Sequence, residues 1–289
     1  MKAWDEFSSM EKRKSSCVNC GTELQGTFCH SCGEKQIDQK DKSLIHFLEE
    51  FVASVFFADG KFFKTIKLSI TKPGELTRSF VAGIRKKYLS PLQLFFFANL
   101  IYFIFPVIST FNTTLDVQMY QLPYSSSVRP VVERYLEITQ DDPDVFKVEY
   151  ERASNANGKL LLIVLVVLQG LFLKLLFLRN KKLYLIDFFA GSAYFYGFYT
   201  LFILVLFPTL FNWFSSLFSF GLASSINELS LSIIFMLIII GYMFTMLKRA
   251  YETSNKGALW RGILLGIFII PSFIIYRYIL FWVTFWTVT

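Results

Sequence analysis

Over its 289 residues the chain is 54% hydrophobic and only 18% charged, whereas soluble domains carry about a quarter charged residues. Charges are dense up to residue 87 and absent from long stretches beyond residue 159, which indicates a polar head before a membrane body and excludes one large soluble core. The net charge of +7 does not indicate nucleic-acid binding, because the basic residues lie beside apolar segments, where they set orientation and meet anionic lipid headgroups.

The first predicted element is a zinc ribbon within a cytoplasmic head at residues 1–40, in the segment CVNCGTELQGTFCHSCG. It holds two CxxC pairs, and each is followed by a glycine that gives a metal-binding turn its permissive backbone. Four thiolates in a tetrahedral array favour zinc over harder cations, and such a closed site is structural. We expect one structural Zn²⁺ per chain, with the ligands Cys17, Cys20, Cys29 and Cys32.

The alternatives for the four cysteines are disulfides and a redox-active CxxC motif. The first forty residues contain no apolar signal run, so we expect the head to stay in the cytoplasm, where disulfides are rare. A redox motif would lie on a βαβ pattern, which the sequence lacks. His30 could replace a cysteine ligand but is expected to be an exposed neighbour of the site. The stretch HSCGEKQIDQKDK mixes both signs of charge, which disfavours nucleic-acid binding.

Residues 41–90 are predicted to form an amphipathic, interfacial helical segment. In residues 43–57 apolar side chains recur at intervals of three and four, opposite two glutamates. In KFFKTIKLSITKPG, phenylalanines and isoleucines are mixed with Lys61, Lys64 and Lys67, which is typical of a helix lying in the membrane surface. The alternative is core packing of both stretches in a small helical unit, with His46 as a packed or surface residue.

Three stretches carry a resemblance to a known family: the CxNCG…FCxxCG ribbon, FFKTIKLSITKPGEL and VAGIRKKYLSP. The chain is similar there to an uncharacterised bacterial family of zinc-ribbon, multi-span membrane proteins, whose defining segment is the domain of unknown function 3667. The resemblance covers residues 17 to 97, and its more specific elements are Lys72, Pro73, Gly74, Gly83, Arg85, Tyr88 and Pro91. It implies a zinc ribbon followed by membrane helices, and it implies no activity.

Residues 91–289 are predicted to be a five-helix membrane domain, because about 20 apolar residues cross the hydrocarbon layer. The spans are expected at 91–110, 160–178, 188–210, 229–247 and 262–286. The fold class is therefore an all-α polytopic membrane protein with a small N-terminal zinc ribbon and interfacial amphipathic helices.

Loop charges predict the orientation of these spans. Basic residues precede the first span and lie in the loops after the second and the fourth, whereas the 211–228 loop has no lysine or arginine. We expect a bacterial inner-membrane protein with a cytoplasmic N-terminus, an external C-terminus and an external insertion at 111–159. That insertion is too long for a structureless loop, so we expect a small mixed element in which VVERYLEI is helical and FKVEYER alternates weakly.

Charges within the spans have an ordinary and a functional interpretation. Lys174 lies one turn from the inner end of its span, so its side chain can extend to the headgroups. Arg277 lies in the outer half of the last span, where outward extension among aromatic residues is favoured over a substrate site. Transporters usually need several buried ionisable groups, and only Asp187, at a span edge, adds to these two, which disfavours a coupled transporter.

Three functions remain open from the sequence. The leading hypothesis is a non-enzymatic membrane protein, in contact with membrane lipid, whose zinc ribbon recruits or senses a cytoplasmic protein partner. The first alternative is a channel or transporter, formed by one chain or a homo-oligomer, with a path past Asn99, Gln169, Lys174 and Arg277. The weakest is a lipid-modifying enzyme, because no HExxH, GxSxG or clustered carboxylates lie in or beside the spans, and no catalytic residue is assigned.

Overall fold

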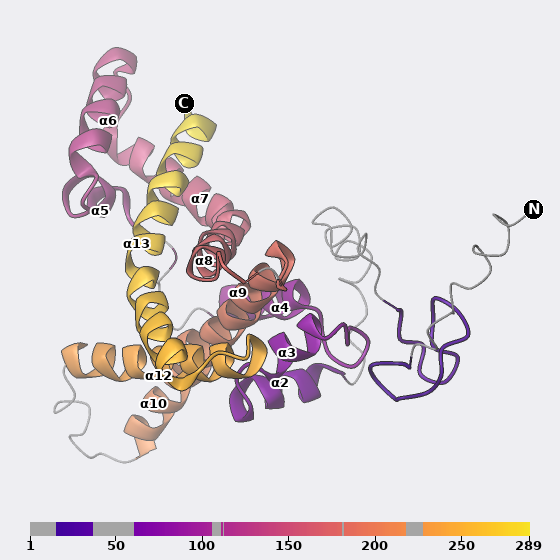
Figure 1. Ribbon diagram of the computed structural model, residues 1–289. Helices are drawn as coiled ribbons and strands as arrows, with labels where there is room; N and C mark the ends of the chain where they lie inside the picture. Colours follow the sequence, from indigo (N-terminus) through magenta and orange to yellow (C-terminus); the bar gives the residue numbers. More distant parts are fainter. Residues whose placement is uncertain (1–15, 37–60, 106–110, 112, 181, 218–227) are drawn as a thin grey trace, which may run out of the picture.

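The structure is a computed structural model that describes residues 16–36, 61–105, 111, 113–180, 182–217 and 228–289. Every regular element in these ranges is a helix, apart from two isolated β-bridges in the N-terminal ribbon. Helices suit a membrane chain because they satisfy their backbone amides internally. The predicted class, an all-α membrane protein with an N-terminal cysteine cluster, is confirmed (Figure 1).

Among the described residues, three short helices come after the ribbon. The helix α2 (Lys61–Thr71) is joined to α3 (Glu75–Val81) by a tight turn, and α4 (Pro91–Ile104) follows after a loop. The start of α4 is a capping box, in which Ser90 Oγ accepts from the Gln93 N–H at 3.3 Å and the Gln93 side chain accepts from the Ser90 N–H at 2.8 Å. The predicted helix at 61–70 is present, whereas the stretch at 43–57 and His46 lie outside the described residues.

Three helices of the described chain are long and apolar enough to cross a membrane: Leu185–Phe211, Ser232–Ala250 and Asn255–Val288. The first consists of α9 (Leu185–Phe198), the π-helical segment η2 (Tyr199–Leu206) and the start of α10 (Phe207–Leu217). The others lie in α12 (Glu228–Ala250) and α13 (Asn255–Val288). A fourth span results if α7 (Pro143–Leu161) and α8 (Ile163–Leu176) cross as one, with a bend of 42° between them.

Within the described residues there are thus three or four candidate spans, where five were expected in the whole chain. The expected span at 91–110 is the 14-residue helix α4, and residues 106–110 lie outside the described chain. Fourteen residues rise about 21 Å, which is less than the hydrocarbon thickness of about 30 Å. The helix packs against α9 and η2, and its Leu94, Phe95 and Ala98 side chains are fully or almost fully buried. Over its described residues, α4 is thus a helix of the bundle core.

The insertion at 111–159 is helical. It forms α5 (Leu115–Tyr120), α6 (Ser125–Thr139) and most of α7. The expected helix at VVERYLEI is found in α6, but the expected alternation in FKVEYER is wrong, because this stretch is part of α7. There Phe146 and Tyr150, one helical turn apart, pack together with Phe281 and Phe285 from the end of α13. Packing at helical spacing overrides the weak two-residue pattern.

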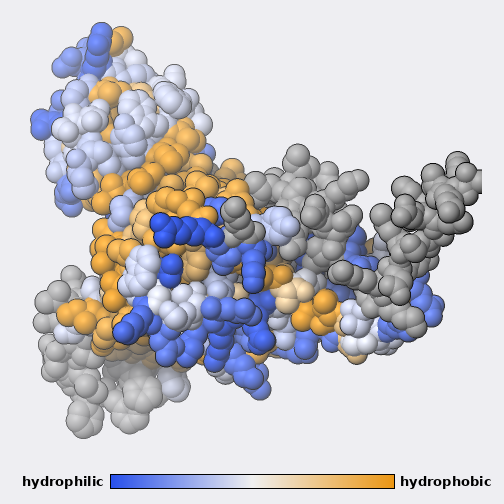
Figure 2. Space-filling model, viewed as in Figure 1, coloured by the Kyte–Doolittle hydropathy of each residue, from blue (hydrophilic) through white to orange (hydrophobic). Residues whose placement is uncertain are grey.

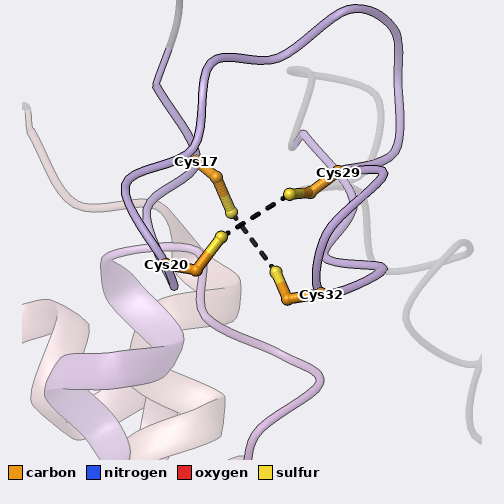
Figure 3. Close-up of side chains that lie close together, drawn as sticks. All are labelled: Cys17, Cys20, Cys29 and Cys32. Carbon is orange, nitrogen blue, oxygen red and sulfur yellow. Dashed lines mark hydrogen bonds between the residues drawn. The ribbon is translucent and has the colours of Figure 1, made fainter.

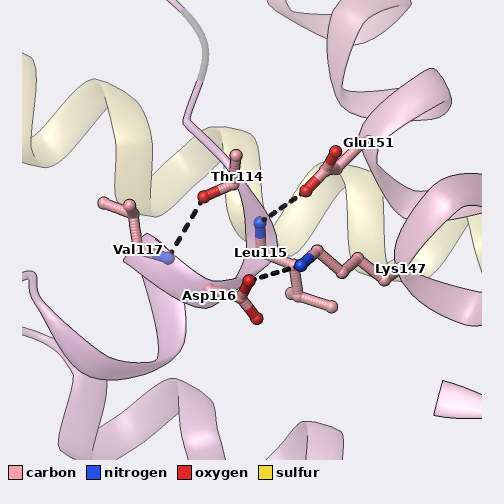
Figure 4. Close-up of polar contacts among 6 residues, drawn as sticks. All are labelled: Thr114, Leu115, Asp116, Val117, Lys147 and Glu151. Atoms are coloured by element: carbon pink, nitrogen blue, oxygen red, sulfur yellow. Dashed lines mark hydrogen bonds and ion pairs between the residues drawn. The ribbon is translucent and has the colours of Figure 1, made fainter. Parts of the chain in front are cut away.

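Polar contacts hold α5 against α7 (Figure 4). The Lys147 ammonium pairs with the Asp116 carboxylate, and the Glu151 carboxylate accepts a hydrogen bond from the Leu115 N–H at 3.3 Å. Figure 2 shows hydrophilic residues gathered over α5 and α6, with hydrophobic residues below them along α13. This polar end and apolar middle are what a membrane body with an exposed insertion requires.

The hairpin of α12 and α13 is packed through small residues. A Cβ atom on Gly262 would lie 3.2 Å from the Phe244 backbone nitrogen, and one on Gly266 would lie 2.9 Å from Ile240 Cγ1. The two glycines form a GxxxG pattern, which lets membrane helices approach closely. Sequence reasoning passed over this pattern, although it was visible in RGILLGIF.

Candidate metal centre

The ribbon in residues 16–36 consists of two turns of the same design. In each turn the glycine after the second cysteine has a positive φ, 76° at Gly21 and 70° at Gly33. The Gly21 N–H donates to the Cys17 carbonyl and the Gly33 N–H to the Cys29 carbonyl, both at 2.8 Å. Glycine adopts positive φ at little cost, so the CxxCG spacing directs each pair of cysteines into the same turn.

The four thiols converge on one point (Figure 3). Cys17 Sγ lies 3.6 Å from Cys32 Sγ, Cys20 Sγ lies 3.6 Å from Cys29 Sγ, and all four sulfurs lie within 4.8 Å of one another. A disulfide requires about 2.05 Å, and all four cysteines are free. A tetrahedral ion with metal–sulfur bonds of about 2.3 Å places its sulfurs about 3.8 Å apart. The arrangement therefore fits a four-thiolate metal site.

The environment of Cys20 favours the charge state that binds metals. Cys20 Sγ lies 3.2 Å from Thr22 Oγ1. Hydrogen bonds with the Thr22 side chain and backbone, and with Cys32 and Cys29, lower the pKa of the Cys20 thiol to about 6. A thiol with this pKa is largely a thiolate at neutral pH, and thiolates are the form that ligates metal.

His30 is exposed and lies outside the cluster. Within the described ranges, the four cysteines form the one group of at least three potential ligands that could hold an ion. Four protein ligands complete a tetrahedral shell and leave no position for a substrate or water. The geometry thus fits a structural site, as the spacing predicts, and the identity of its metal stays a prediction.

Glu34 joins this ribbon to the membrane body. Its side chain is buried, and its carboxylate accepts hydrogen bonds from the Arg85 N–H at 2.9 Å and the Lys86 N–H at 3.3 Å. The Glu34 carbonyl accepts from the Cys29 N–H at 2.7 Å, so the same residue contacts the second cysteine turn. The Lys86 ammonium also lies 5.7 Å from the centre of the Phe28 ring. These contacts join the ribbon to the loop before α4.

The loop that Glu34 contacts continues into the helical core. The Leu89 N–H donates to Thr65 Oγ1 of α2 at 3.0 Å, and the Leu89 carbonyl accepts from the Tyr194 hydroxyl of α9 at 2.8 Å. The stretch RKKYLS therefore links the ribbon to α2 and α9. The sequence analysis did not identify Glu34 as a contact between the ribbon and the helices. Its position directly after the second CxxCG was the one signal that could have indicated this role.

The residues suggested for a transport path each contact their own local neighbours in the bundle. Asn99 is buried, donates to a backbone carbonyl of its own helix at 2.9 Å and lies 3.4 Å from Thr200 Oγ1. The buried Gln169 side chain contacts Met243 Sδ at 3.9 Å, and the Lys174 ammonium lies 5.5 Å from the centre of an aromatic ring. These contacts link neighbouring helices of the bundle.

Asp187 and Arg277 also have local partners. The Asp187 carboxylate accepts from the Tyr184 N–H at 2.8 Å and so caps the first turn of α9. Arg277 is half-buried and lies close enough to Tyr199 and Tyr276 to interact electrostatically with both. The structure therefore gives Asp187 a structural role that its place at a span edge did not reveal.

Comparison with known proteins identifies a family for one segment of the chain. The family described as "Protein of unknown function (DUF3667)" matches residues 59–103, which contain α2, α3, the loop contacted by Glu34 and most of α4. No curated protein and no solved structure matches the chain. The cysteine ribbon precedes the matched residues and contacts them through Glu34. The segment at 59–103 is thus similar to the DUF3667 family, as its sequence motifs predict.

Proposed function

We propose that the chain is a non-enzymatic, multi-pass protein of the bacterial inner membrane whose cytoplasmic ribbon binds one structural zinc ion and recruits a protein partner. Zinc is the metal that four thiolates favour, and a closed shell supports a structural role. The distribution of basic loops supports a cytoplasmic N-terminus and an external C-terminus. When bound, the ion would supply the folding energy that so short a segment cannot obtain from a hydrophobic core.

Exposed apolar side chains on the ribbon carry the proposal of a partner. Val18 and Phe28 are each 56% exposed, and each is adjacent in sequence to the first cysteine of its pair. A metal-braced turn holds such side chains in a fixed position, which reduces the entropy that a partner must overcome on binding. The contact of Glu34 with the loop at residues 85–86 fixes the ribbon, and hence any recruited partner, beside the membrane body.

The test is purification of the full chain from native membranes in mild detergent, followed by identification of the proteins that co-elute. The double variant Val18→Ser/Phe28→Ser should keep its zinc and lose the partner, because it alters the exposed surface and leaves all four thiols. The variant Cys17→Ser/Cys20→Ser should lose both. Gln25→Ala, an exposed polar position on the same ribbon, serves as the control. A partner that co-elutes equally with all variants would contradict recruitment by the ribbon.

A further inference from the structure

A groove of about 540 Å³ lies between α12 and the start of α13, on residues that neither the metal centre nor the proposed function uses. One wall is a stripe on α12 formed by Leu237, Gly241, Phe244 and Lys248. These residues are spaced by four, three and four positions and so share one helix face. The other wall comes from the first turns of α13 and includes Lys256.

The groove is apolar at one end and basic at the other. Its apolar end is formed by α12 up to Phe244, and its basic end is where α12 finishes and α13 begins, at Lys248 and Lys256. The stripe from Leu237 to Lys248 extends about 16 Å along the helix, close to the roughly 15 Å of hydrocarbon in one leaflet. This length and polarity match a single lipid molecule.

The two lysines are available for an anionic ligand. Among the described residues, neither Lys248 nor Lys256 forms an ion pair with a carboxylate. Glu252, the single acid in the connecting turn, is not part of the groove lining. Two ammonium groups at the basic end therefore present positive charge beside an apolar channel, with no ion pair to a carboxylate in the described part of the chain.

The apolar part of the groove is open. A Cβ atom added to Gly241 would meet no other atom within 4 Å, and Leu237 is 64% exposed. In the candidate span Ser232–Ala250, the surroundings of this face are expected to be lipid and not water. An acyl chain is thus the occupant that matches the position of the groove.

We propose that this groove binds a phospholipid with an anionic headgroup, with one acyl chain along the Leu237–Phe244 stripe and the phosphate between Lys248 and Lys256. Ammonium–phosphate pairs are charge-assisted and strong, and the cytoplasmic leaflet is the anionic one. The basic end of the groove lies in the loop that the charge distribution assigns to the cytoplasmic side, so headgroup and lysines meet at the same surface.

The test is a lipid titration of the purified full chain in detergent, followed by native mass spectrometry. The probes are phosphatidylglycerol and phosphatidylcholine with identical chains, and glycerol 1-phosphate as a headgroup without chains. We expect the first phosphatidylglycerol to bind more tightly than the first phosphatidylcholine. Glycerol 1-phosphate should not compete, because the acyl chain contributes through burial of its CH₂ groups. Competition by glycerol 1-phosphate at equal concentration would indicate a phosphate site and overturn the lipid proposal.

Variants distinguish this groove from general lipid contact. Lys248→Gln/Lys256→Gln should lower the affinity for the first phosphatidylglycerol molecule about 25-fold, because each lysine near an anionic headgroup contributes a factor of about five. Gly241→Phe should fill the groove and displace the lipid without lowering the unfolding temperature, because a side chain there has room. Lys182→Gln, an exposed lysine in another basic loop, is the control and should bind as the wild type does. Equal affinities for the wild type and the double lysine variant would refute the proposal.

Discussion

Glu34 joins the ribbon to the membrane body through hydrogen bonds, and its removal should weaken this contact. Glu34→Ala leaves the Arg85 and Lys86 N–H groups without their acceptor, and hydrogen bonds to a charged group contribute about 1.5–3 kcal/mol. We expect faster proteolysis within residues 16–36 and 83–90. Metal content should stay at the wild-type level, because the four thiols are unchanged.

The control for this variant is Glu23→Ala, an exposed glutamate on the same ribbon. It should be cleaved at the wild-type rate. Limited proteolysis of both variants in detergent checks the prediction. Equal cleavage of the Glu34→Ala and Glu23→Ala variants would mean that the buried carboxylate does not hold the ribbon in place.

At the scale of elements, the turn between α2 and α3 packs backbone to backbone against α12. Gly74 has a φ of 84°, and a Cβ atom there would lie 2.6 Å from the Met246 Cα. The Arg249 guanidinium donates to the Pro73 carbonyl at 3.0 Å and so fixes the same turn to the end of α12. The positive φ and the lack of space for a Cβ atom together explain why glycine follows Lys72 and Pro73. This turn lies within the segment that matches the family.

Gly74→Ala should therefore destabilise the protein by more than about 1 kcal/mol, because alanine is strained at positive φ and its methyl group has no space. Gly241→Ala is the matched comparison, since that glycine lies within α12 with open space around it. It should be neutral or stabilising by up to about 1 kcal/mol. Thermal unfolding in detergent measures both, and unfolding temperatures that shift equally would contradict the account of the turn.

The sequence predicts these elements unevenly. Local signals were sufficient for the two cysteine turns and for the helix at 61–70, since spacing and glycine placement act within a few residues. Contacts between distant residues were not predictable, and Glu34 with Arg85 is the clearest example. The end of α4 at Ile104 does have a local signal, because helices usually end before a proline and Pro106 follows. The bend between α7 and α8 depends instead on how the helices pack.

At the scale of the whole molecule, the loop charges predict the orientation in the membrane, and reporter fusions test it directly. Reporter fusions after Lys87, Lys182 and Lys256 should be cytoplasmic, and fusions near Asp142 and at Thr289 should be external. The Asp142 fusion also tests α4, because an external reading requires the chain to cross between Lys87 and Asp142. A cytoplasmic reading at Asp142 would show that α4 does not cross, and an external reading at Lys182 would overturn the orientation.

The metal content of the purified full chain tests the central claim, a structural zinc ribbon anchored on a membrane body. Elemental analysis should find about one zinc ion per chain in the wild type and none in Cys17→Ser/Cys20→Ser, because four thiolates are needed to close the site. In the variant, residues 16–36 should be cleaved faster by proteases. Its helical content should be retained, since lipid and helix packing stabilise the spans. A wild-type chain with reduced thiols and no zinc, or a double variant with full zinc content, would contradict the claim.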